Sequence, residues 1–109
     1  MKKLIYIASP YTHSDPNVVE ENYRLVAEFT AECTAKGYIV LSPIAYGHNL
    51  AKHAEMRTDW EFWQNFCFSF LDRCDELWIL KIDGWYKSRG VAEEIEFAVK
   101  KGMPIIYVD

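Results

Sequence analysis

A chain of 109 residues is long enough for one domain and too short for a second hydrophobic core. Half of its residues are apolar and 16% are aromatic, which excludes a disordered chain. The net charge of −4 disfavours a nucleic-acid polymer as partner, because binding a phosphate backbone requires a basic face. A single nucleotide is compatible with this charge, since it needs only a few local donors.

The cysteine pattern and the apolar runs indicate the compartment. Cys33, Cys67 and Cys74 form neither a CxxC pair nor a Cys/His metal spacing, so we expect reduced thiols and no metal or other cofactor. The N-terminal run MKKLIYIASPY is too short for the apolar segment of a signal peptide. No apolar stretch is long enough to cross a bilayer. We therefore expect a soluble cytoplasmic protein without a membrane partner.

The first half of the chain predicts two strands and a helix. The apolar run 4–8 predicts a strand buried on both faces. Asp-Pro at 15–16 is typical of a helix N-cap followed by proline at the first helical position, and Gly37 is typical of the residue that follows a helix. Residues 38–41 predict a second buried strand, which ends at the Ser-Pro pair 42–43.

The second half continues the alternation. Residues 44–57 predict a loop with a short helix, and residues 59–73 predict a helix that is rich in aromatic residues and apolar on all sides. Such a helix is buried on more than one side, which favours a subunit interface and a homodimer or larger assembly. Residues 76–82 predict a third strand, 91–101 a helix that ends at a glycine, and 104–108 the last strand.

Strands that alternate with helices predict right-handed βαβ units with helices on both faces of the sheet. The predicted fold class is α/β, a small Rossmann- or flavodoxin-like three-layer sandwich with a mostly parallel sheet of four or five strands. It forms a single domain over residues 1–109. Ligands of such sheets bind beyond the carboxyl ends of the strands. Polar residues and glycines gather there in three segments, 9–14, 42–49 and 83–90.

The third segment leads into a helix that begins near Ser88 and Gly90. Unpaired N–H groups and the helix dipole favour an anion at such a start. Glu94 follows six residues after Ser88. This spacing is compatible with a phosphate at the helix start and a carboxylate facing the sugar. Taken alone, however, it favours an ordinary N-cap at Ser88 with a solvated carboxylate at Glu94.

A longer pattern surrounds these residues. The segment GWYKSRGVAEEIEFAVKKGMP, residues 84–104, fits the pattern G-W-x-x-S-x-G-x-x-x-E-x-x-x-A-x-x-x-G-x-P. With this pattern, the chain resembles the nucleoside 2-deoxyribosyltransferase-like superfamily, particularly its branch of nucleotide N-glycosidases and related uncharacterised domains. The resemblance extends nearly end to end, through IYIASPYT, LSPI and RCDELWIL.

The resemblance implies a reaction and roles for three residues. Glu94 matches the glutamate that attacks C1′ of the sugar, Ser88 the serine that contacts the 5′-phosphate, and Tyr6 a tyrosine that positions the glutamate. The implied activity is hydrolysis of a (deoxy)nucleoside 5′-monophosphate to free base and sugar 5-phosphate through a covalent intermediate. The alternatives are transfer of the deoxyribosyl group to another base, which Ser88 disfavours because the transferases have aspartate there, and a nucleotide-binding module without turnover.

One position departs from the pattern. Relatives have an aspartate that assists the departing base where this chain has Cys67. A cysteine replaces it poorly as an acid or acceptor. Asp59, Asp72 or His48 is then expected to take over, or the protein turns nucleotides over weakly, or it only binds them.

The remaining candidates are single residues near the predicted site. Arg89 is favoured as a phosphate donor, and Tyr11 and Trp85 are candidates to stack on the base. Further candidates for ligand contact, from the polar segments and from scattered cations, are Ser9, Gly90, His13, His48, Arg24, Lys52 and Arg57.

Overall fold

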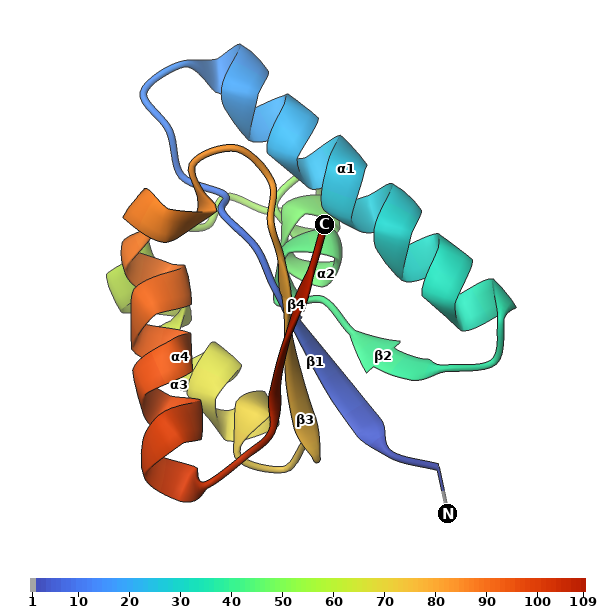
Figure 1. Ribbon diagram of the computed structural model, residues 1–109. Coiled ribbons are helices and arrows are strands. Elements are labelled where there is room, and N and C mark those ends of the chain that lie inside the picture. The colour runs from blue at the N-terminus through green and yellow to red at the C-terminus, as the bar shows by residue number, and fades with distance from the viewer. Residues whose placement is uncertain (1) are drawn as a thin grey trace.

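A computed structural model describes residues 2–109 (Figure 1). Over these residues the elements are, in chain order, β1 (Leu4–Ala8), α1 (Pro16–Ala35), β2 (Ile39–Leu41), α2 (Pro43–Leu50), α3 (Trp60–Leu71), β3 (Glu76–Leu80), the short 3-10 helix η1 (Trp85–Lys87), α4 (Arg89–Lys101) and β4 (Ile105–Val108).

The four strands form one open sheet in the order β2-β1-β3-β4, and every neighbouring pair is parallel. This is the flavodoxin-like order, and it confirms the predicted α/β fold class. The chain leaves β1 towards β2 and then crosses to β3 on the other side. The strand order therefore reverses between β1 and β3, where such sheets form a ligand crevice.

Helices cover both faces of the sheet (Figure 1). Because side chains alternate along a strand, Tyr6 and Ala8 of β1 pack in the core shared with α3 and α4, whereas Ile7 packs in the core shared with α1. Helix α2 lies beside α1 and contributes Ile44 to the second core. No helix within residues 2–109 has both the length and the apolar character needed to cross a membrane.

The turn chemistry of α1 is as predicted. Asp15 Oδ1 accepts a hydrogen bond from the backbone N–H of Asn17 at 2.9 Å, with Pro16 at the first helical position. Gly37 follows the helix with a φ of 94°, a conformation that costs glycine little. These caps fix where the chain enters and leaves the long helix on this face.

Two sequence expectations about burial are wrong. The strand predicted at 38–41 was expected to be buried, but β2 is an edge strand paired only with β1, and Ile39 is 49% exposed. The helix predicted to be apolar on all sides has a polar face with Glu61, Asn65 and Ser69 exposed. The stripe of α3 that contains Cys67 and Leu71 is buried in the core, whereas Phe62 and Phe70 remain 46% and 43% exposed.

Helix α4 begins at Arg89 rather than at about 91. The backbone N–H of Val91 donates to Ser88 Oγ at 3.2 Å, which makes Ser88 the N-cap. Glu94 consequently lies on the second turn of the helix, on its buried side.

Candidate functional site

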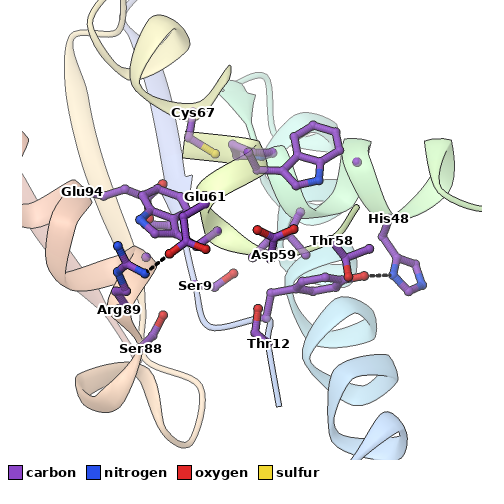
Figure 2. A pocket seen from close by; sticks show the side chains of 18 of the residues that line it. Ser9, Thr12, His48, Thr58, Asp59, Glu61, Cys67, Ser88, Arg89 and Glu94 are labelled. Carbon is purple, nitrogen blue, oxygen red and sulfur yellow. Dashed lines mark hydrogen bonds and ion pairs between the residues drawn. The ribbon is translucent and has the colours of Figure 1, made fainter. Parts of the chain in front are cut away.

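A cavity of about 390 Å³ lies beyond the carboxyl end of β1, bordered by α2 and by the starts of α3 and α4 (Figure 2). It lies at the edge of the sheet where the sequence predicts the ligand site. All three predicted polar segments contribute to it, through residues such as Ser9, His48 and Ser88. In Figure 2, Glu94 and Arg89 lie on one side of the cavity and His48 on the other.

Glu94 is the buried carboxyl group of this cavity. Its side chain lies between α4 and β1 with 5% of the residue exposed, and it accepts a short hydrogen bond from the Tyr6 hydroxyl. Burial raises the pKa of Glu94 to about 8, although the Tyr6 hydrogen bond opposes part of the rise. The alternative of a solvated carboxylate is therefore wrong, and Glu94 carries a proton near neutral pH.

Tyr6 and Cys67 complete the surroundings of this carboxyl group. Tyr6 is fully buried on β1, and its own pKa is raised well above the ordinary value by burial and then by the charge of Glu94. Cys67 reaches the same point from α3 and is 5% exposed. Burial, followed by the charge of Glu94, raises the pKa of the Cys67 thiol to about 12. At neutral pH all three groups are protonated, and a bound ligand meets a neutral centre.

The start of α4 forms one end of the cavity. Ser88, Arg89 and Gly90 line it together with Lys87. The first N–H groups of a helix have no carbonyl partner within the helix, so they are available to an anion. The Ser88 hydroxyl accepts from Val91 N–H as a cap and keeps its own proton to donate. This end suits a group such as a phosphate.

Arg89 is held by two carboxylates. Its Nη1 lies 2.5 Å from Glu61 Oε1 and its Nε 2.8 Å from Glu93 Oε2. Both contacts are with exposed or half-buried partners, where ion pairs are weak. The guanidinium thus lines the cavity as predicted, but an incoming anion has to compete for it with Glu61 and Glu93.

Ser9 supplies a second polar group, next to the end of β1. Its residue is 5% exposed, and its Oγ has no hydrogen-bond partner within residues 2–109. Buried hydroxyls are nearly always paired. Because this one borders the cavity, a hydroxyl or phosphate of a ligand is the natural partner.

Two indole rings from α3 form the apolar wall. A Cβ placed on Gly90 would lie 3.2 Å from Trp60 Cε3, and one on Gly47 would lie 3.0 Å from Trp63 Cη2. Both glycines therefore allow a tryptophan to approach the backbone of a neighbouring helix. The cavity consequently combines polar ends with a flat aromatic side that suits a planar ligand.

A chain of hydrogen bonds closes the other end. The Tyr11 hydroxyl lies 2.6 Å from His48 Nδ1, and His48 Nε2 lies 2.9 Å from Glu20 Oε1 of α1. The ring of Tyr23 stacks on His48 with centroids 4.0 Å apart. Tyr11 and His48 both line the cavity, whereas Glu20 faces solvent.

Several predicted contacts are not brought to this cavity. Trp85 does not line it, because its ring packs against Tyr107, 5.6 Å away, so the predicted stacking of a base between Tyr11 and Trp85 is wrong. Asp72 follows the end of α3 that lies away from the cavity, where it accepts a hydrogen bond from Lys101 Nζ. Four other candidates also lie outside the lining of the described cavity, namely His13, Arg24, Lys52 and Arg57.

Sequence reasoning missed the indole wall. It interpreted the aromatic side chains of α3 as a subunit interface and did not place Trp60 or Trp63 at the site. The sequence carried a signal for this wall: Trp60, Trp63, Cys67 and Leu71 recur at intervals of three and four residues and so share one helix face.

No group of acidic, histidine or cysteine side chains within residues 2–109 is placed to hold a metal ion.

The fold and the site together define a class: a small flavodoxin-like α/β domain with a buried carboxyl group at its switch-point cavity. Residues 3–109 match the family described as Domain of unknown function (DUF1937), and the chain belongs to that family. No curated protein matches the chain.

Proposed function

We propose that this protein hydrolyses the N-glycosidic bond of a (deoxy)nucleoside 5′-monophosphate, releasing the base and a sugar 5-phosphate. The observation that carries the proposal is Glu94, a buried carboxyl group held by Tyr6 beside a cavity large enough for a small ligand. Buried carboxyl groups with raised pKa values cluster at catalytic centres. The resemblance of the segment 84–104 to the nucleoside 2-deoxyribosyltransferase-like superfamily agrees with this choice.

In the proposed reaction, an oxygen of ionised Glu94 forms a bond to C1′ while the bond from C1′ to the base breaks. The bonding electrons leave with the base nitrogen. Water then attacks C1′ and displaces Glu94, as in retaining glycosidases. Tyr6 donates to the carboxylate and holds its orientation. Positive charge that develops on the sugar favours the ionised form of Glu94 at the moment when the nucleophile is needed.

The polar end of the cavity supplies the phosphate contacts in this proposal. Ser88 donates from its hydroxyl, the first N–H groups of α4 point at the anion, and Lys87 adds a cation. The Ser9 hydroxyl, which lacks a partner within the described chain, is free to contact the sugar. The indoles of α3 lie beside the base.

A nucleotide-binding module without turnover is the second candidate. Cys67 favours it, because this thiol stands where relatives have the aspartate that assists the base, and its pKa of about 12 makes it a poor acid. The proposal further includes a homodimer, no cofactor, and no nucleic-acid or membrane partner. A cytoplasmic location agrees with the free thiols of Cys33, Cys67 and Cys74.

The proposal is tested by incubating the protein with a panel of ribo- and deoxyribonucleoside 5′-monophosphates and the matching nucleosides, followed by chromatography for free base. Base release from nucleotides in preference to nucleosides supports the proposal. Addition of a second free base as acceptor distinguishes hydrolysis from transfer. Binding without base release supports the module, and neither binding nor release contradicts both.

A further inference from the structure

The departing base needs a proton, and the groups around Glu94 do not offer one. Cys67 has a pKa of about 12, so its thiol is a weak acid at neutral pH. Asp59 borders the cavity, but Arg57 holds both of its oxygens at 2.8 and 2.5 Å and, through these bonds, lowers its pKa. Asp59 is therefore ionised at neutral pH. Asp72 lies outside the cavity and bonds Lys101.

The opposite end of the cavity holds a different arrangement. Glu20 accepts from His48 at Nε2, which fixes that nitrogen as a donor whether or not the ring is charged. His48 Nδ1 then faces the Tyr11 hydroxyl at 2.6 Å, a short separation for such a pair. The side chain of His48 is 9% exposed, whereas that of Glu20 is 63% exposed. The chain thus runs from solvent, through a buried imidazole, to a phenol at the cavity.

We propose that Glu20, His48 and Tyr11 form a proton relay, with the Tyr11 hydroxyl as the atom that protonates the departing base. When His48 Nδ1 carries a proton, it donates to the Tyr11 oxygen and leaves the phenol O–H free to point into the cavity. As the bond from C1′ to the base breaks, the Tyr11 proton passes to the base, and the Nδ1 proton of His48 replaces it. This inference rests on the proposed function.

The same relay balances the second half of the reaction. Neutral His48 then accepts, through Tyr11, the proton released when water attacks C1′, and Glu94 departs as a carboxylate. Net hydrolysis therefore consumes one water molecule and returns the relay to its starting state. The groups that face the imidazole are Tyr11, Glu20 and Tyr23, with Lys52 Nζ 5.4 Å from the Tyr23 ring centre.

The relay predicts an effect that depends on the leaving group. Tyr11→Phe and His48→Gln should slow base release from an ordinary nucleotide by about 10²–10⁴-fold, the usual worth of general acid assistance. On 4-nitrophenyl sugar 5-phosphate, whose leaving group departs without protonation, the same variants should stay within about threefold of wild type. Tyr23→Phe is the matched control, because it removes a phenol hydroxyl bonded to Asn49 from a ring that stacks on His48 but lies outside the cavity lining.

The outcomes separate the relay from the proposed function. Equal losses on both substrates, or no loss on either, overturn the relay while leaving nucleotide hydrolysis in place. A wild type that cleaves neither substrate overturns the proposed function and the relay with it. Independently of turnover, ¹⁵N NMR of wild-type His48 should show the neutral ring protonated at Nε2, and Glu20→Gln should weaken that preference. A neutral ring in the wild type with its single proton on Nδ1 instead of Nε2 contradicts the relay.

Discussion

At the scale of single residues, the burial of Glu94 opposes the catalytic role proposed for it. Its carboxyl group lies among Tyr6, Cys67 and apolar side chains, and within residues 2–109 it accepts one side-chain hydrogen bond, from Tyr6. An isolated buried charge is costly, so the group keeps its proton to a pKa of about 8. A nucleophile must lose that proton before it reacts. The chemistry proposed for Glu94 therefore has a definite dependence on pH.

The first prediction concerns the rate. In the proposed reaction only the ionised form of Glu94 attacks C1′. On 4-nitrophenyl sugar 5-phosphate, whose leaving group needs no proton from the relay, kcat/KM should therefore rise about tenfold per pH unit below the Glu94 pKa of about 8 and level off above it. Initial rates of 4-nitrophenol release measured from pH 6 to pH 9.5 check this. A rate that falls over this range would mean that Glu94 acts as an acid and not as a nucleophile.

The second prediction concerns stability. The folded pKa of about 8 exceeds the ordinary value of 4.5, so between these values the folded state binds more protons than the unfolded state. The free energy of unfolding should then fall as pH rises, by up to roughly 1.4 kcal/mol per unit. Glu94→Gln removes this contribution. Urea unfolding at pH 5, 6.5 and 8 should show wild type losing stability relative to the variant, and parallel curves would contradict the burial argument.

At the scale of elements, close helix approaches shape the cavity. Helix α3 supplies its indole wall because α2 and α4 each present a glycine to it, at Gly47 and Gly90. The caps at Ser42 and Ser88 start α2 and α4 at the same edge of the sheet. The site is thus assembled from the first turns of helices, which follow the carboxyl ends of parallel strands.

The third prediction tests the contact between Gly47 of α2 and Trp63 of α3. In Gly47→Ala the new Cβ would lie 3.0 Å from the Trp63 ring, so the indole must shift. Overpacking typically costs about 1–3 kcal/mol, against about 1 kcal/mol gained from helix propensity, so we expect a net loss of up to about 2 kcal/mol. Trp63→Phe makes room, and in that background Gly47→Ala should no longer destabilise. Chemical unfolding of the four proteins in this double-mutant cycle measures the coupling, and additive effects would show that the contact is unimportant.

At the scale of the whole molecule, the structural features that the sequence predicts and those that it does not predict have different physical causes. The alternation of strands and helices and the helix caps follow from local signals, such as Asp-Pro at 15–16 and Gly37, which act within a few residues. The position of the site follows from the topology of a parallel sheet. The burial of Glu94 and its contact with Tyr6 agree with the roles that the resemblance implied.

Contacts between segments that are distant in the chain are harder to predict from the sequence. The sequence makes Trp85 a candidate either for stacking on the base or for packing at a subunit interface, but its ring packs on Tyr107 of β4, an interaction that no local pattern reveals. The bond between His48 and Glu20 joins residues far apart in the chain. Such pairs depend on how helices cross, which spacing within one helix does not determine.

The fourth prediction concerns assembly. An aromatic face remains exposed on α2 and α3, formed by Tyr46, Phe62, Phe66 and Phe70, with Tyr46, Phe62 and Phe70 each between 43% and 49% exposed. Exposed apolar patches commonly mark interfaces, so we expect a homodimer through this face. Phe62→Ser combined with Phe70→Ser should produce a monomer, whereas Val99→Ser on the outer side of α4 should not. Light scattering at micromolar concentration checks this, and a monomeric wild type would contradict it.

The central claim is that Glu94 cleaves the nucleotide, and the most direct measurement compares base release by wild type, Glu94→Gln and Glu96→Gln. Glu96 is the matched control, because it undergoes the same change on the same helix but is exposed and paired with Lys100. We expect wild type and Glu96→Gln to release base at similar rates, and Glu94→Gln to release none while remaining folded. Base release that persists in Glu94→Gln, or its absence from wild type on every nucleotide tested, would contradict the account.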